Sequence, residues 1–470
     1  MNQRNRKEIS ALTEILTRND CISAADYARF PVKRGLRNPD GTGVSVGLTK
    51  VCSVEGYYID DGEKTPKPGC LKYRGVNIAD FVAGIQKENR FGYEEITWLL
   101  LFGFLPTKFQ LDGFCDFLSG LRELPEDFLE DMIMKAPSPD IMNKLARSVL
   151  ALYSYDPDPE DTSVENVLLQ CIGLIARMPT IMSSAYQVKR RHYYRKSMFL
   201  HPIRPEQKTA EMILNSIRPD CRFTDEEAKL LDLLLIMQAE HGGGNNSTFT
   251  VRSLTSTGTD TYSAIAGGIG ALKGPKHGGA NRKVCEMTED FKDHIRNVND
   301  DGQVADYIRK VVSKEGGDGT GLIYGMGHAV YTMSDPRAVI LKKEAKKFAE
   351  KNDCMDDFVL LDAIERLTPQ VFAEMKKSNK VMCANVDLYS GLLYRMLGIP
   401  EDLFTPLFTV ARTAGWSAHR LEEMLTGGRI IRPAYKSLAL PMDYVPMNER
   451  TSSLQELASA EYIPLDERKC

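Results

Sequence analysis

The sequence predicts an all-α protein with one small β hairpin near its N-terminus. Helical patterns fill most of the chain, whereas good strand patterns occur only between Val44 and Tyr73. At 470 residues the chain is longer than one ordinary hydrophobic core supports, so we expect more than one domain.

The predicted hairpin has three parts. The stretch VSVGLTKVCSVEGYYI (44–59) favours a first strand, and CLKYRG (70–75) favours a second. Between them, DDGEKTPKPG (60–69) is rich in turn-forming residues. We therefore expect a turn over residues 60–69.

The clearest helix is TDEEAKLLDLLLIMQAEHGGG. Thr224 and Glu227 have the spacing of a capping box, and glycines 242–244 end the pattern. Apolar residues fill this helix on nearly all sides, which is typical of a buried helix. We therefore expect His241 to lie inside the protein. The stretch DTYSAIAGGIGALKG (260–274) predicts a helix of small residues that packs closely on a neighbour.

Composition favours a cytoplasmic protein. Apolar residues make up 43% and charged residues 26% of the chain, as in a globular protein, and the net charge of −4 gives no general footprint for nucleic acid. The basic stretch KRRHYYRK (189–196) is short and predicts a solvated loop rather than an RNA site. No membrane contact is expected, because no apolar run approaches about 18 residues and the N-terminus lacks a signal-peptide pattern. Ten scattered cysteines without a C-x-x-C pair indicate reduced thiols.

Three of the seven histidines stand beside glycines. His241 occurs in HGGGNNSTF, His277 in GPKHGGAN and His328 in YGMGHAVY. Glycine has no Cβ and allows a backbone or a ligand to come close. The pattern suggests histidine rings that face a bound molecule, with the glycines making room for it.

Three arginines lie in largely apolar sequence: Arg337 in SDPRA, Arg412 in VARTAGW and Arg432 in IIRPAYKS. Each alone would more often pair with an internal Asp or Glu. Together with the three histidines, they indicate a site for a small polyanionic acid, because guanidinium grips carboxylates in bidentate fashion. Asp387, in CANVDLYSG, is a possible general base.

Two other functions fit parts of the pattern. GVSVG (43–47) and HGGG (241–244) match serine-hydrolase motifs, but their order is reversed and no alternating strands surround them. A metal-dependent hydrolase could use His241, His277, His328 and Asp387 as ligands. No two of these are close in the sequence, so the expectation is no metal.

Five segments together resemble citrate synthase, in the family's order: AEHGGGNNSTF, GALKGPKHGGAN, YGMGHAVYTMSDPRA, CANVDLYSG and VARTAGWSAHRLEE…RIIRP. The resemblance extends from about Gly47 to Tyr435 and includes the citrate/2-methylcitrate synthases of bacteria. This chain differs from many bacterial members of the family at Gly242, where they have Glu, and at Ala434, where they have a second arginine.

The resemblance implies a two-domain, all-α homodimer. Residues 1–277 and 391–470 would form the large, dimer-forming domain, and residues 278–390 the small domain on the CoA side of the cleft. The implied catalytic residues are His277, His328 and Asp387. The implied oxaloacetate-binding set is His241, Asn245, Arg337, Arg412 and Arg432, with Arg432 supplied by the other subunit. The segment GLIYGMGHA (321–329) would lie near the CoA adenine, and no cofactor is expected because acetyl-CoA is a substrate.

The implied reaction condenses acetyl-CoA with oxaloacetate and water to give citrate and CoA. Asp387 would take a methyl proton, and a neutral His277 would stabilise the enolate. We expect Asp387 to stay ionised because the site is rich in arginine. The alternatives are a 2-methylcitrate synthase that uses propionyl-CoA, a metal-dependent hydrolase, and a helical scaffold with a decayed site, which is weakened because every matched catalytic position is filled.

Overall fold

The computed structural model describes residues 13, 22–38, 41–60, 63–376 and 382–450. The chain divides into two compact units. One comprises residues 47–431, and the other combines the residues before 47 with those from 432 onward.

The smaller unit contains little regular structure among its described residues. Its elements are α2 (Ala24–Arg29) and the 3₁₀ turns η1 (Arg34–Leu36) and η5 (Met447–Glu449). Lys436 Nζ lies 4.1 Å from the centroid of the Phe30 ring. This cation–π contact joins the two chain segments of the unit.

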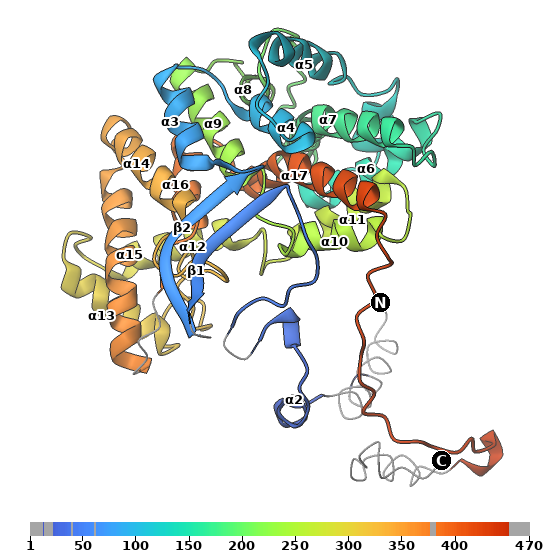
Figure 1. Ribbon diagram of the computed structural model, residues 1–470. Coiled ribbons are helices and arrows are strands. Elements are labelled where there is room, and N and C mark those ends of the chain that lie inside the picture. Colours follow the sequence, from blue (N-terminus) through green and yellow to red (C-terminus); the bar gives the residue numbers. More distant parts are fainter. Residues whose placement is uncertain (1–12, 14–21, 39–40, 61–62, 377–381, 451–470) are drawn as a thin grey trace. The chain divides into compact units, whose positions relative to one another are not determined.

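The larger unit is mainly helical, which confirms the all-α prediction (Figure 1). Its α-helices are α3 (Ile78–Lys87), α4 (Tyr93–Phe102), α5 (Lys108–Gly120), α6 (Ile141–Leu152), α7 (Val164–His192), α8 (Thr209–Ile217), α9 (Asp225–Gln238), α10 (Asn246–Thr255), α11 (Thr261–Lys273), α12 (Ala280–His294), α13 (Asp301–Val312), α14 (Pro336–Lys351), α15 (Met355–Lys376), α16 (Asp387–Met396) and α17 (Phe404–Thr426). Shorter turns are η2 (Leu129–Met134), η3 (Tyr153–Tyr155) and η4 (Glu401–Leu403).

The sheet is antiparallel, in the order β1 (Cys52–Asp60), β2 (Glu63–Tyr73), β3 (Val76–Asn77). The hairpin prediction is confirmed, but the turn predicted over 60–69 is wrong in extent, because β2 already begins at Glu63. Pro66 pairs with Tyr57 inside the strand. On the side of β2 that faces away from β1, the residues before Lys72 have no partner strand in the described part of the chain, and such an edge position tolerates proline.

Two glycines let this hairpin lie directly on the segment that follows His328. A Cβ on Gly69 would lie 2.1 Å from the backbone oxygen of Ser334, and one on Gly56 would lie 2.6 Å from that of Val330. Thr332 Oγ1 donates a hydrogen bond to the Gly56 oxygen at 2.8 Å. The hairpin therefore fixes residues 330–334.

Helix α17 forms the centre of the core, with an unbroken run of buried residues from Pro406 to Leu421. The capping box of Thr224 and Glu227 at the start of α9 is confirmed. Helix α9 ends at Gln238, before the predicted end, and His241 is buried in the following turn. The expectation about this histidine is therefore confirmed.

The small-residue helix α11 packs closely on its neighbours, as predicted. A Cβ on Gly267 would lie 2.2 Å from Leu254 Cδ1 of α10, and one on Gly268 would lie 2.7 Å from Val251 Cγ2. Only glycine permits this separation of α10 and α11.

Helix α7 is long and apolar enough to span a membrane by composition, but 78% of its most apolar window is buried inside the protein. It is therefore a core helix. The solvated loop expected over residues 189–196 is wrong in part, because α7 continues to His192. Lys189 is buried, and its Nζ pairs with Asp402 Oδ1 at 2.7 Å.

Helices α12 to α16 pack chiefly on one another. Figure 1 shows α13, α14 and α15 gathered on one side of the hairpin. This group contacts the rest of the unit mainly through α14, which packs on α3, α9 and β2, and through α12, which packs on α17.

Candidate active site

The predicted site residues come from loops and helix ends that meet in the larger unit. The rings of His241, after α9, and His328, before α14, have centroids 5.0 Å apart. The charges of Arg337, Arg412, His277 and His328 all act on His241. The structure thus brings these residues together with Asp387, which lies within the field of Arg337.

His241 is a neutral, buried imidazole. Burial, followed by the nearby cationic side chains, lowers its pKa well below its usual value. Its Nε2 atom is buried and has no hydrogen-bond partner in the described part of the chain. This nitrogen is therefore available to a ligand.

The glycine after His241 serves the protein backbone. Gly242 has φ +88°, which favours glycine, and a Cβ would lie 3.1 Å from Val54 Cγ2. Its N–H donates to Glu240 Oε1 at 2.6 Å. The carboxylate that holds this turn is that of Glu240, the residue directly before His241.

The glycines near His277 and His328 are also packed against protein. A Cβ on Gly278 would lie 2.5 Å from the Leu272 oxygen, and one on Gly325 would lie 2.8 Å from Leu388 Cδ1. At Gly278 and Gly325 the missing Cβ therefore makes room for protein atoms. Gly327, directly before His328, has only Met382 Cγ within 4 Å of its Cβ position, at 3.8 Å, so the expectation that glycine makes room for substrate stays a prediction there.

His277 is half-buried between α11 and α12, and burial, followed by the charge of Arg412, lowers its pKa to about 4. The ring is therefore neutral at pH 7. Its Nε2 atom lies 3.0 Å from both Asn245 Oδ1 and Ser247 Oγ. Trp416 Nε1 donates to the same Ser247 oxygen at 3.2 Å. Asn245, predicted to bind substrate, lies against His277 in this structure.

The backbone fixes the proton of His328. Its Nδ1 atom accepts hydrogen bonds from the N–H groups of Val330 and Tyr331, each at 3.0 Å. Because Nδ1 is the acceptor, the proton of the neutral ring lies on Nε2. His328 is thereby prepared to act as a hydrogen-bond donor through Nε2.

Asp387 is the first residue of α16. Burial raises its pKa to about 6, and this effect exceeds the opposing effect of Arg337. The carboxyl group is still mostly ionised at pH 7, as expected, but Arg337 only partly offsets the effect of burial. No described residue donates a hydrogen bond to the carboxylate, and a raised pKa makes Asp387 a stronger base.

Arg337 has an internal carboxylate partner. Its Nε and Nη2 atoms donate to the two oxygens of Asp335, at 3.1 and 2.7 Å. Asp335 also caps α14 by accepting from the Arg337 N–H at 2.9 Å. The pairing that the sequence offered as the structural alternative is therefore present, and it leaves Nη1 without a described partner.

Arg412 lacks such a carboxylate. It is completely buried in α17, and only its Nε atom is paired, with the Gln238 oxygen at 2.8 Å. Both Nη1 and Nη2 are buried without a hydrogen-bond partner in the described part of the chain. A buried guanidinium with two unused donors is arranged for an anionic ligand.

Arg432 differs from the other predicted site residues in the unit to which it belongs. It is exposed and belongs to the smaller unit.

The comparisons with known proteins agree with one another. The family model described as "Citrate synthase, C-terminal domain" matches residues 40–434. Citrate synthase from Acidithiobacillus ferridurans is 36% identical over 82% of this chain and 93% of its own. The chain belongs to the citrate synthase family. Citrate synthase from Corynebacterium glutamicum is 35% identical over 78% of this chain and 79% of its own. The crystal structure of citrate synthase from Thermotoga maritima superposes with a TM-score of 0.69 at 27% identity, covering 90% of this chain and all of that one.

Membership of the citrate synthase family makes the chain an enzyme and does not favour the hydrolase alternatives. Among the described residues, no group of three or more His, Cys, Asp and Glu side chains is arranged to hold a metal ion.

Sequence reasoning missed several residues of this site. Glu240 and His419 are fully buried partners, and Tyr331 stacks on His328 with ring centroids 4.5 Å apart. One sequence signal could have revealed His419. It stands seven residues after Arg412 in the same apolar helical stretch, so both residues were to be expected on one buried helix. Nothing in the sequence indicated the role of the hairpin in supporting residues 330–334.

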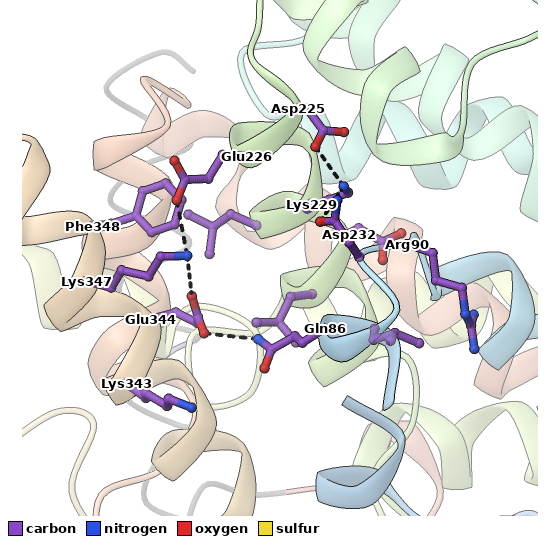
Figure 2. Close-up of a pocket in the computed structure, with 14 residues that line it drawn as sticks. Gln86, Arg90, Asp225, Glu226, Lys229, Asp232, Lys343, Glu344, Lys347 and Phe348 are labelled. Carbon is purple, nitrogen blue, oxygen red and sulfur yellow. Dashed lines mark hydrogen bonds and ion pairs between the residues drawn. The ribbon is translucent and has the colours of Figure 1, made fainter. Parts of the chain in front are cut away.

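A separate cavity of about 510 Å³ lies between α3, α9 and α14 (Figure 2). Its polar walls are paired internally, as between Glu226 and Lys347 at 3.1 Å and between Gln86 and Glu344 at 3.0 Å. None of the predicted site residues lines it. This cavity is therefore distinct from the candidate site at the histidines.

Proposed function

We propose that this enzyme condenses acetyl-CoA with oxaloacetate and water to give citrate and CoA, at the site of the three histidines. The observation that carries the proposal is the buried Arg412 guanidinium, whose Nη1 and Nη2 have no described partner. Oxaloacetate supplies carboxylates for this arginine and a ketone for a neighbouring donor. The citrate synthase names of the relatives support the same reaction.

In the first step, Asp387 takes a proton from the acetyl methyl group. The thioester methyl is a very weak acid, so the enolate oxygen needs a donor where the charge develops. His277 is neutral at pH 7 and offers an N–H without being a strong acid. A carboxylate with a pKa of about 6 is a stronger base than an ordinary aspartate.

In the second step, the enolate carbon attacks the ketone carbon of oxaloacetate. The His328 Nε2–H donates to the ketone oxygen and gives it a proton as the carbon–carbon bond forms; the ring regains a proton from the attacking water in the last step, and the proton that Asp387 took from the methyl group leaves with the CoA thiol. Its backbone-bound Nδ1 keeps the donor in place. Arg412, His241 and the Nη1 atom of Arg337 hold the carboxylates.

In the last step, water hydrolyses the citryl thioester to citrate and the CoA thiol. Water must be excluded until then, and closure of two domains would achieve this. We propose residues 278–390 as the moving small domain, with residues 321–329 near the CoA adenine, and 1–277 with 391–470 as the large one. The packing of α12 to α16 chiefly on one another supports this division. Residue 390 falls inside α16 (Asp387–Met396), so the flexible joint would lie at an end of that helix.

We further propose a cytoplasmic homodimer that needs no cofactor, with Arg432 reaching the partner's site. Exposed apolar side chains along the C-terminal segment support an intersubunit contact: Ile430, Tyr435, Met442, Tyr444 and Met447. Burial of this surface on a second subunit would be favourable.

Initial rates of CoA thiol release, with oxaloacetate and either acetyl-CoA or propionyl-CoA, test the proposal. We expect activity with acetyl-CoA to survive exhaustive chelation. Higher kcat/KM with propionyl-CoA would assign a 2-methylcitrate synthase instead, since one methylene changes discrimination by only about 1–3 kcal/mol. Loss of activity on chelation that zinc restores would assign a metal-dependent enzyme.

A further inference from the structure

Tyr331 places an unpaired hydroxyl group in the active site. Its side chain is 2% exposed, and the hydroxyl has no hydrogen-bond partner in the described part of the chain. A buried hydroxyl without a partner is unfavourable, because water would otherwise satisfy it. The group therefore needs an explanation beyond packing.

The protein holds the Tyr331 ring firmly. The ring stacks on His328 and lies 5.5 Å from the His241 ring, centroid to centroid. Its backbone N–H is bound to His328 Nδ1 at 3.0 Å. A Cβ on Gly69 would lie 2.8 Å from Tyr331 Cδ1, so the β hairpin covers the ring.

The electrostatic surroundings of the hydroxyl favour an anionic ligand. Among charged neighbours, Arg337 has the largest effect on Tyr331. The other buried donors without partners around this site are His241 Nε2 and the two Nη atoms of Arg412. A ligand that satisfies them must carry several acceptor oxygens.

We propose that the Tyr331 hydroxyl donates a hydrogen bond to the oxaloacetate carboxylate that Arg337 binds, and so contributes to the selection of this substrate. The inference rests on the proposed function. It adds a substrate contact next to Arg337, which gives one Nε–H and one Nη2–H to Asp335 and keeps two Nη1–H groups and one Nη2–H for a ligand. A carboxylate has about four acceptor sites, so the Tyr331 hydroxyl can donate to the same group that Arg337 binds.

Substitution of Tyr331 by Phe tests the proposal, because Phe keeps the ring and removes only the hydroxyl. The dissociation constant of oxaloacetate, measured by calorimetry without CoA, should rise about 10- to 100-fold, as expected for a lost hydrogen bond to a charged group. The KM for acetyl-CoA and kcat at saturating oxaloacetate should stay within about twofold. The melting temperature of the ligand-free enzyme should rise, because the variant lacks a buried unpaired hydroxyl.

Tyr93 provides a matched control. It is also buried, but its hydroxyl already donates to the backbone oxygens of Val410 and Ala411, at 3.1 and 3.3 Å. Tyr93→Phe should lower the melting temperature and leave oxaloacetate affinity unchanged. If the role of Tyr331 is purely structural, Tyr331→Phe should likewise lower the melting temperature and leave oxaloacetate affinity unchanged.

The proposal is supported if Tyr331→Phe binds oxaloacetate more weakly than the parent and also has a higher melting temperature. Oxaloacetate affinity within twofold of the parent, or a lower melting temperature with unchanged affinity, overturns it. If the parent enzyme itself binds no oxaloacetate and releases no CoA, the proposed function fails as well, and the two failures are thereby distinguished. If Tyr331→Phe does not fold, Tyr331→Met, which also lacks the hydroxyl, replaces it, and an oxaloacetate dissociation constant within twofold of that of the parent would overturn the proposal.

Discussion

His419 Nε2 lies 3.0 Å from Glu240 Oε1, and neither side chain is exposed to solvent. Arg252 Nη1 lies 2.7 Å from the other ring nitrogen, Nδ1. An arginine can only donate, so Nδ1 is an acceptor and the ring proton lies on Nε2. His419 therefore donates to Glu240.

Glu240 connects His419 to the turn that carries His241. The same Oε1 atom accepts the Gly242 N–H at 2.6 Å, which fixes the turn that carries His241. A Cβ on Gly415 would lie 2.2 Å from Glu240 Oε2, so the carboxylate has no room to rotate. The pair thus orients His241 without touching substrate.

Glu240→Ala should weaken oxaloacetate binding about 10-fold or more and lower the free energy of unfolding by about 1–3 kcal/mol, because buried donors lose their acceptor. Glu240→Gln keeps an oxygen acceptor for His419 and Gly242, so most of the affinity should return. Calorimetric titration and chemical denaturation measure both effects. Equal affinities of the Ala variant and the parent would contradict the positioning role.

Asp387→Asn should lower kcat roughly 10²–10⁴-fold with little change in oxaloacetate affinity, because the amide keeps the shape but cannot take a proton. Proton exchange of the acetyl methyl group with solvent, followed by NMR, reports the step directly. Undiminished exchange in this variant would remove Asp387 from the role of base.

The raised pKa of Asp387 predicts two effects of pH. The ionised base is lost as pH falls through about 6, so kcat/KM for acetyl-CoA should fall about tenfold per unit below that value. A folded-state pKa above the unfolded one also means that stability is lost as pH rises through 6. Asp387→Asn should therefore raise the melting temperature at pH 8 more than at pH 5. A pH-independent difference would contradict the shift.

Gly69→Ala should displace the β hairpin, because the new Cβ would lie 2.1 Å from the Ser334 oxygen. We expect a loss of stability of about 1–3 kcal/mol together with a lower kcat, since residues 330–334 follow His328. Gly84, in α3, is the control: nothing lies within 4 Å of its Cβ position, so Gly84→Ala should stabilise the protein by about 0.5–1 kcal/mol. Similar melting temperatures of the two variants would refute this account of the hairpin.

Subunit mixing tests the proposed role of Arg432 in the partner's site. Asp387→Asn and Arg432→Ala subunits, each nearly inactive, are mixed and allowed to exchange. A shared site leaves one intact site in each hybrid dimer, so about a quarter of all sites should regain activity. If Arg432 serves its own subunit, every site keeps one defect. No recovery, with exchange confirmed by mass spectrometry, would exclude sharing.

Most of the fold could be predicted from local patterns. The capping box at Thr224 and the apolar surface of α9 predicted a buried helix that delivers His241 to the interior, and the structure agrees. The strand limits were less accurate, because the prolines of β2 signal a turn locally but are tolerated at an open edge.

The candidate site residues could be named from sequence because their motifs are local, and Arg432 alone lies outside the unit that holds the rest. The sequence thus determined the helical class, the family and the residues that we propose meet substrate. Only the tertiary structure decided what each residue does with its neighbours. Burial outweighs the effect of Arg337 on the pKa of Asp387, and Asp335 accepts hydrogen bonds from Nε and Nη2 of Arg337. Arg412 keeps Nη1 and Nη2 without a partner in the described part of the chain. These outcomes depend on dehydration and on distances between segments far apart in the chain, which no local pattern encodes.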